Sequence, residues 1–251
     1  MPDAEARVWL LDLPEVLAAN DESALTAMLA PAERVRAAQF HQPIDRLRFV
    51  ARRAGLRQIL GACLREDPAR LEFAAREQGK PYLAGAHRGA LHFNASASGA
   101  IACVAVSRDE DIGVDIERRR AIADAPALAA RYFSAAEQDA VRVANATAVA
   151  ADPSARQSAF LIVWTRKEAF LKHCGLGLVD DLPNVHVGLP QWGVALRADY
   201  GGASGSVSGA YLTSFTASQH GAIVSLATVN PHLRIRFATH GRVSDTLDRV
   251  P

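Results

Sequence analysis

The chain has 251 residues, of which 49% are hydrophobic and 22% charged. This balance is typical of a globular protein and excludes a disordered one. Its 28 basic and 27 acidic residues nearly cancel, so no net charge draws the whole chain to nucleic acid or to a membrane surface. The three cysteines, Cys63, Cys103 and Cys174, are far apart and form no CxxC pair, which argues against a disulfide framework and a structural zinc site.

The sequence shows neither a signal peptide nor a membrane span. Charged residues such as Asp3, Glu5 and Arg7 interrupt any apolar run at the N-terminus. The long uncharged stretches at 89–107 and 200–233 contain too many polar and glycine residues for a spanning helix. We therefore expect a soluble, cytoplasmic protein that binds no nucleic acid and no membrane.

Residues 31–65 place apolar side chains at helical spacing. The polar face of this segment is basic: Arg34, Arg36, Arg46, Arg48, Arg52, Arg53 and Arg57. Residues 78–81 then predict a turn, because Gly79 and Pro81 flank Lys80.

Residues 101–106 predict a short apolar strand, followed by a charged turn at 108–111. Residues 112–117 predict the strand that returns from this turn. A period of two puts Ile112, Val114 and Ile116 on one face and Asp115 and Glu117 on the other.

The second half begins with a capping-box spacing from Ser134 to Glu137, which predicts the start of a helix. Pro153 interrupts the alanine-rich stretch after it. Residues 158–174 are again helical in pattern, with Gly175 and Gly177 as stop signals.

Residues 210–216 and 222–229 predict a closing hairpin, and the last twenty residues a loose polar tail. A helix followed by a hairpin thus occurs once in each half. We expect an α+β fold with an N-terminal lobe at 1–110, a C-terminal lobe at 111–230 that carries the reactive motifs, and a tail at 231–251.

Asp115 and Glu117 are the first candidate site. Two carboxylates on one face of a strand can chelate a hard cation through oxygen. The alternative is a solvated strand face, which is the commoner meaning of such a pair.

Glu168 and Lys172 are the second candidate site, since residues four apart on a helix project together. Glu168 would then be a third oxygen ligand or a base, and Lys172 would neutralise a phosphate. The alternative is an ordinary surface pair, with Trp164 as a core anchor.

A third candidate is an anion site at Lys80 and residues 94–99, where small hydroxyls and backbone N–H groups suit phosphate oxygens. Ser96 could equally be a turn residue, and it lacks the G-x-S-x-G setting of a nucleophile. Of the 28 basic residues only Lys80, Lys167 and Lys172 are lysine, and two of them lie in these candidate sites.

Together these motifs resemble a known family. Residues 113–117 (GVDIE) and 164–172 (WTRKEAFLK) are similar to the two signatures of the surfactin-type (Sfp-type) 4'-phosphopantetheinyl transferases. Residues 79–81 (GKP), 93–96 (FNAS) and 131–137 (RYFSAAE) match further family motifs in the same order. The resemblance extends from about residue 46 to residue 229.

The resemblance implies two α+β lobes related by a pseudo-twofold axis, with coenzyme A between them. It implies transfer of 4'-phosphopantetheine from coenzyme A to a serine of an apo acyl or peptidyl carrier protein, releasing 3',5'-ADP. It also implies the site residues: Asp115, Glu117 and Glu168 as Mg²⁺ ligands, Glu168 as the base, Lys172 at the pyrophosphate, and Lys80, Pro81, Ser96 and Arg53 on coenzyme A.

The chain departs from the family pattern at Ala97, where the family has a histidine that meets the coenzyme A 3'-phosphate. Two alternatives follow: a non-catalytic homologue that binds coenzyme A or a carrier protein, and another Mg²⁺-dependent nucleotide enzyme. The carrier in this family is an acidic helical protein. The basic and aromatic residues Arg118, Arg119, Arg120, Arg131, Tyr132 and Phe133 are candidates to dock it on a monomeric enzyme.

Overall fold

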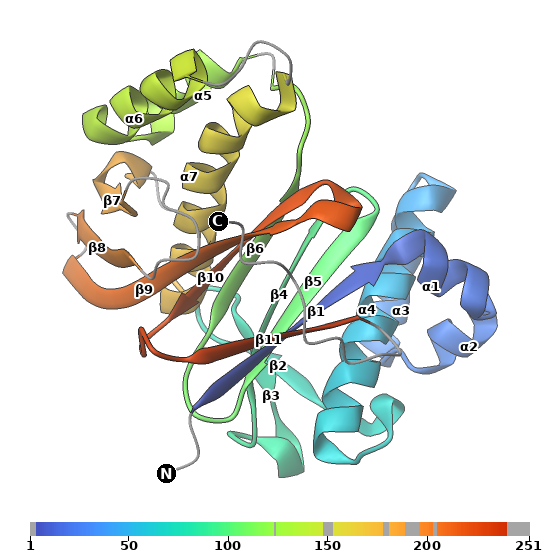
Figure 1. The fold of residues 1–251 in the computed structure, drawn as a ribbon. Coiled ribbons are helices and arrows are strands. Elements are labelled where there is room, and N and C mark those ends of the chain that lie inside the picture. Colours follow the sequence, from blue (N-terminus) through green and yellow to red (C-terminus); the bar gives the residue numbers. More distant parts are fainter. Residues whose placement is uncertain are drawn as a thin grey trace.

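The fold is α+β, with two main β-sheets that each carry helices on one face (Figure 1). The computed structural model describes residues 4–122, 124–147, 153–177, 181–188, 196–202 and 205–239. Helices α1–α4 lie at one end of the molecule and α5–α7 at the other, with the strands between them (Figure 1). Within the described residues, no helix is long and apolar enough to cross a membrane.

The first sheet has the strand order β11-β1-β5-β4. Its strands are β1 (Glu5–Asp12), β4 (His92–Ser98), β5 (Ile101–Ser107) and β11 (Arg234–Thr239). Four helices cover it: α1 (Leu13–Ala19), α2 (Glu22–Ala27), α3 (Pro31–Ala38) and α4 (Pro43–Leu64). Between α4 and β4 lie β2 (Phe73–Ala75) and β3 (Pro81–Leu83), which form a small hairpin, and the short helices η1 (Pro68–Arg70) and η2 (Gly85–His87).

The second sheet has the strand order β6-β10-β9-β8-β7. Its strands are β6 (Gly113–Arg118), β7 (Val185–His186), β8 (Leu196–Gly202), β9 (Gly205–Ala217) and β10 (Ala222–Thr228). Its helices are α5 (Ala125–Tyr132), α6 (Ala135–Thr147) and α7 (Pro153–Cys174), with the short helices η3 (Leu182–Asn184) and η4 (Ser218–His220). Helix α7 packs against β6, β9 and β10.

A third apolar core joins the two sheets. Alternate residues of β1, β5, β6 and β10 meet there, while the intervening residues of β1 and β5 face the helices α1–α4. Each sheet therefore buries both faces over its central strands, and β5 and β10 are buried along their whole length.

Several predicted elements are confirmed. Ser134 N donates to Glu137 Oε2 (2.9 Å) and Glu137 N to Ser134 Oγ (3.3 Å), which is the predicted capping box at the start of α6. Helix α7 ends at Cys174, directly before Gly175, whose φ is +68°. Strands β9 and β10 form the predicted antiparallel hairpin.

The helical segment at 31–65 is divided in two. Helix α3 ends at Ala38 and α4 begins at Pro43, where Gln42 is extended (φ −90°, ψ 126°). A residue before proline is disfavoured in the helical region, which explains the break.

Residues 112–117 do not return beside β5, so this prediction was wrong. Strand β5 already has β1 on one edge and β4 on the other, and it has no edge left for a third partner. Strand β6 crosses to the second sheet and pairs antiparallel with β10.

The tail predicted at 231–251 was wrong for residues 234–239. These form β11, which pairs parallel with β1 and places Phe237 in the core between the sheets. The alternation of Arg234, Ile235, Arg236 and Phe237 is the strand signal that the polar composition obscured. Residues 240–251 lie outside the described part of the chain.

Candidate active site

Strand β6 separates an apolar face from an acidic one. Ile112, Val114 and Ile116 are at most 1% exposed and pack between the two sheets. Because side chains alternate along a strand, Asp115 and Glu117 face the other way. Asp115 is 5% exposed, and Glu117 is half-buried. The predicted faces of this strand are confirmed.

Helix α7 brings Glu168 and Lys172 to this strand. The helix lies against Gly113, where an added Cβ would stand 2.1 Å from the backbone oxygen of Ala169. Any side chain at position 113 would push the helix away, since such a contact is far inside van der Waals distance. The close approach lets Lys172 Nζ donate to Asp115 Oδ1 at 2.5 Å.

Burial and neighbouring carboxylates raise the pKa of both Asp115 and Glu168. Burial raises the pKa of Asp115, an effect that outweighs the lowering by Lys172 and Ser96. Burial also raises the pKa of Glu168, and the charges of Asp115 and then Glu117 add to it against the lowering by Lys172. A positive charge placed among the three carboxylates would relieve this repulsion.

The donor set suits a hard divalent cation. Described hydrogen bonds reach Asp115 only at Oδ1 and Glu117 only at Oε2, which leaves one oxygen of each available. The Glu168 carboxylate has no hydrogen bond or ion pair within the described residues. However, no three such side chains of the described chain already stand in position to hold a metal ion. The residues fit the ion by chemistry, and their side chains would have to move to enclose it.

A cavity of about 300 Å³ opens beside Glu168 and Lys172, with Lys80, Pro81 and Asn94 among its lining. Lys80 Nζ donates to the backbone oxygen of His173 at 2.9 Å and lies 3.5 Å from Asp111 Oδ1. Burial lowers the pKa of Lys80, against the raising effect of Asp111. Lys80 therefore holds the C-terminal end of α7 against the first lobe's β2–β3 hairpin.

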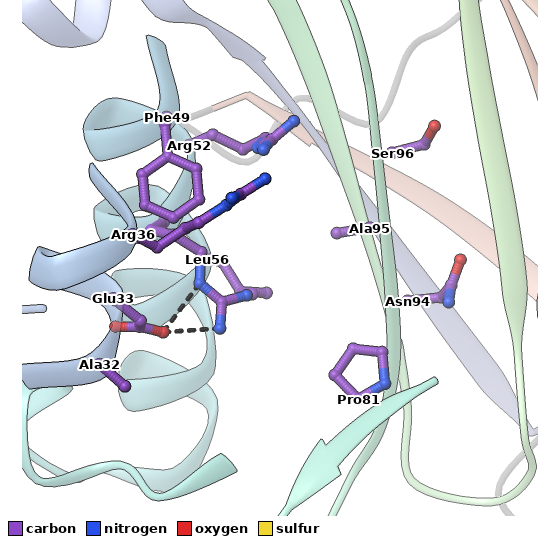
Figure 2. A pocket seen from close by; sticks show the side chains of 11 residues that line it. Ala32, Glu33, Arg36, Phe49, Arg52, Leu56, Pro81, Asn94, Ala95 and Ser96 are labelled. Atoms are coloured by element: carbon purple, nitrogen blue, oxygen red, sulfur yellow. Dashed lines mark hydrogen bonds and ion pairs between the residues drawn. The ribbon is translucent and has the colours of Figure 1, made fainter. Parts of the chain in front are cut away.

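A second cavity, of about 520 Å³, shares Pro81, Asn94 and Ala95 with the first and continues to α3 and α4. Figure 2 shows Arg36 and Arg52 reaching from these helices toward Ala95 and Ser96 on β4. These arginines make this end of the cavity cationic.

Arg53 also lines the second cavity, but it is committed to a carboxylate. Its Nη2 lies 2.6 Å from Glu33 Oε1, and the dashed lines in Figure 2 end on Glu33. Arg52 has no hydrogen-bond or ion-pair partner among the described residues, and its guanidinium lies 5.7 Å from the centre of the Phe49 ring. Burial, and then the neighbouring Arg53, lowers the pKa of Arg52. Arg52 is thus the arginine that is open to an anion.

Lys167, in the same signature as Lys172, lies away from the cavities and is fully buried. Its Nζ lies 2.8 Å from Glu137 Oε2 and donates to the backbone oxygens of Leu182 and Val185. This lysine stabilises the packing of α6 and α7 with the segment before β7.

The candidate docking residues are not all on the surface. Phe133 is 1% exposed and its ring packs at a tilt against Phe160 in the core, so it cannot dock a carrier. Tyr132 is half-buried against Trp164, in accord with the core-anchor interpretation of that tryptophan. Arg118, Arg120 and Arg131 are exposed.

Sequence reasoning did not assign Arg52 to the site, and it included Ser98 only within the candidate anion segment 94–99. Ser98 Oγ donates to Glu117 Oε2 at 2.6 Å, in the same way that Ser96 Oγ donates to Asp115 Oδ1 at 2.6 Å. The alternation Asn94-x-Ser96-x-Ser98 was the available signal, because residues two apart on a strand share a face.

Comparisons with known proteins identify the family. Residues 111–220 match the family model described as the 4'-phosphopantetheinyl transferase superfamily, and residues 18–109 match that described as 4'-phosphopantetheinyl transferase, N-terminal.

Similar curated proteins bear the same activity in their names. The 4'-phosphopantetheinyl transferase HetI of Nostoc sp. is 36% identical over 178 residues, which cover 69% of this chain and 70% of that protein. A phosphopantetheinyl transferase of Thraustochytrium sp. is 31% identical, over 86% of this chain and 74% of that protein. The 4'-phosphopantetheinyl transferase Sfp of Bacillus subtilis is 25% identical, over 74% of this chain and 78% of that protein. This chain therefore belongs to the 4'-phosphopantetheinyl transferase superfamily.

Proposed function

We propose that this chain is a surfactin-type 4'-phosphopantetheinyl transferase whose reaction takes place where β6 and α7 meet. As a member of the superfamily it is an enzyme that transfers the 4'-phosphopantetheine of coenzyme A to a serine of an apo carrier protein and releases 3',5'-ADP. One observation supports this location above the others: the Lys172–Asp115 ion pair joins the two signatures beside the cavity that Glu168 and Lys172 line.

Coenzyme A is proposed to lie along the two connected cavities. Lys80, Pro81 and Ser96 would border its pyrophosphate and nucleotide. The arginine-lined end suits the 3'-phosphate. There Arg52 and Arg36 would take the place of the family's histidine, where this chain has Ala97. Arg53 also lines this end of the cavity, where it is held by its ion pair with Glu33.

Mg²⁺ is proposed to bind to Asp115, Glu117 and Glu168, the residues whose mutual repulsion favours a cation. The bound ion would neutralise charge on the pyrophosphate. Binding requires the side chains to rearrange around Asp115, whose Oδ1 now accepts from Lys172.

The chain's own residues then have separate roles. Glu168, half-buried and with a raised pKa, is suited to take the proton from the carrier's serine hydroxyl. Its roles as base and as ligand compete, because ligation lowers the basicity of a carboxylate. Lys172 lines the cavity and would stabilise the negative charge on departing 3',5'-ADP.

The carrier is proposed to be an acidic helical acyl or peptidyl carrier protein that meets the exposed Arg118, Arg120 and Arg131. The enzyme is proposed to act as a monomer, since one chain supplies the lining described for both cavities. Cytoplasmic action is part of the proposal, and the three unpaired cysteines support it. The two lobes are proposed to divide between residues 110 and 111. Strand β11, from the end of the chain, would then belong to the first lobe, because it joins the first sheet.

The test is to incubate a panel of apo carrier proteins with the enzyme, coenzyme A and Mg²⁺ and to weigh the products by mass spectrometry. We expect the mass of one phosphopantetheine group on a carrier serine, and 3',5'-ADP only when an apo carrier is present. Release of 3',5'-ADP without a carrier would instead indicate a phosphohydrolase. Absence of transfer together with tight coenzyme A binding would indicate a non-catalytic binding protein.

A further inference from the structure

The edges of the two sheets meet without a backbone ladder. Strand β4 is the last strand of the first sheet and β6 the first strand of the second, and they are not paired. Side chains of β4 bridge them instead. We call Asn94, Ser96 and Ser98 the polar seam.

The polar seam has a regular offset. Asn94 Oδ1 accepts from Val114 N at 3.0 Å, and Ser98 Oγ accepts from Arg118 N at 3.1 Å, each twenty residues further along the chain. The donated bonds lie nineteen residues apart: Ser96 to Asp115 and Ser98 to Glu117. Each kind of bond keeps its own offset, so β4 and β6 run side by side in one register. Ser96 therefore faces Asp115, and Ser98 faces Glu117.

The proton of the Ser98 hydroxyl has a defined direction. Its oxygen accepts the N–H of Arg118, so its own hydrogen is free to point to Glu117 Oε2 at 2.6 Å. Arg120 Nη1 donates to the same oxygen at 2.9 Å. Two donors therefore hold Oε2, and Oε1 is left for another partner.

Ser98 differs from Ser96 in what it can touch. Ser96 also accepts from Lys172 Nζ at 3.0 Å and lines the arginine-rich cavity, so it stands beside the proposed coenzyme A site. Ser98 lines neither cavity of the site. Among the proposed site residues, Ser98 contacts Glu117.

We propose that Ser98 is a positioning residue: its hydroxyl orients Glu117 so that the free oxygen of this carboxylate faces the proposed cation. This inference rests on the proposed function, because it requires that Glu117 be a ligand. Hydrogen bonds that orient a ligating carboxylate typically change metal affinity by about 10–100-fold when removed.

The experiment measures binding of Mn²⁺, a spectroscopically visible divalent ion, by electron paramagnetic resonance in the presence of coenzyme A. The variants are Ser98→Ala, Ser98→Thr and the matched control Ser107→Ala. Ser107 lies at the other end of the β4–β5 hairpin, is 2% exposed, and accepts only a backbone N–H in the described bonds.

We expect Ser98→Ala to bind Mn²⁺ about 10–100-fold more weakly than the wild type. We expect Ser98→Thr, which keeps the hydroxyl, to recover most of this loss, and Ser107→Ala to bind as the wild type does. Coenzyme A affinity without the metal should be unchanged in all variants. If Ser98 served only to hold the two sheets together, its loss would be expected to affect coenzyme A binding as well.

Three results would overturn the inference, and they differ in what they say of the proposed function. If the wild type binds Mn²⁺ and Ser98→Ala binds it equally well, Ser98 does not position Glu117, while the metal site stands. If the wild type binds no Mn²⁺, both the metal assignment and the role of Ser98 are wrong. A parallel loss in Ser98→Ala and Ser107→Ala that follows their melting temperatures would show a purely structural role.

Discussion

Lys172 and Asp115 form an ion pair, with Nζ 2.5 Å from Oδ1, that joins the last turn of α7 to the middle of β6. The two residues are 57 positions apart in the chain and come from different signature motifs. The pair also includes Ser96 of the first sheet, whose hydroxyl contacts both. Three elements from both sheets therefore meet at one point.

Lys172→Ala should lower kcat strongly. Its ammonium lines the cavity proposed for the pyrophosphate, and loss of one group that stabilises developing charge typically costs about 100-fold or more. We expect the Kd for coenzyme A, measured by calorimetry, to change much less than kcat for carrier modification. A change in coenzyme A affinity with normal kcat would remove Lys172 from the leaving-group role.

Asp115→Asn and Glu168→Gln should each abolish transfer and leave the fold intact. Both substitutions keep the shape of the side chain. Burial raises the pKa of each carboxyl, so its ionised form adds little to stability and the melting temperature should stay within about 4 °C of the wild type. The measurements are product mass and thermal unfolding. A variant that retains wild-type turnover would show that its carboxylate has neither role.

The parts of this site that repeat at short range were predictable. A period of two placed Asp115 and Glu117 on one face of β6, and a spacing of four placed Glu168 and Lys172 together on α7. The two pairs come together because α7 packs closely against Gly113 of β6. This contact joins segments far apart in the chain, and no local pattern encodes it.

Two further features were not predictable for the same reason. Strand β6 leaves β5 because β1 and β4 occupy both edges of that strand, a fact of the whole sheet. Neighbouring helical residues such as Arg52 and Arg53 differ by about 100° around the axis, and only the position of Glu33, twenty residues away, shows which of the two is paired.

Gly113→Ala should destabilise the protein. The new Cβ would meet backbone atoms of α7, at 2.1 Å from Ala169 O and 2.5 Å from His173 N, and neither can rotate away. Overpacking of this kind costs about 2 kcal/mol, which corresponds to a fall of roughly 4–8 °C in melting temperature. Gly201→Ala is the matched control, since no atom lies within 4 Å of a Cβ there. Equal melting temperatures for the two variants would contradict the steric role of Gly113.

Arg52→Gln and Arg53→Gln should have different effects. Arg52 has no hydrogen-bond or ion-pair partner in the described structure, so its loss should weaken coenzyme A binding by about 10–100-fold, the equivalent of one charge-assisted bond. Binding of 3'-dephospho-coenzyme A should be unchanged. Arg53 is bound to Glu33, so its loss should chiefly lower stability. Calorimetry with both ligands distinguishes the two, and a reversed pattern would assign the 3'-phosphate to Arg53.

Glu33 should make the stability of the first lobe depend on pH. Burial alone would raise the pKa of Glu33, but the hydrogen bond from Arg57 and the charge of Arg53 outweigh it and hold this pKa below its usual value. Arg57 is 1% exposed and lies 2.7 Å from Glu33 Oε2. The ionised carboxylate therefore neutralises a buried guanidinium.

The substitution Glu33→Gln leaves this buried charge without a counterion and should cost about 3 kcal/mol at neutral pH. Because the pKa of Glu33 is lowered by folding, the stabilisation is complete above the unfolded-state pKa and is lost as the pH falls through the folded-state pKa. In urea unfolding followed by circular dichroism, the difference between wild type and variant should be constant near neutrality and shrink in acid. A difference that stays the same down to the acid limit would mean that Glu33 stabilises α3 and α4 by packing and not by its charge.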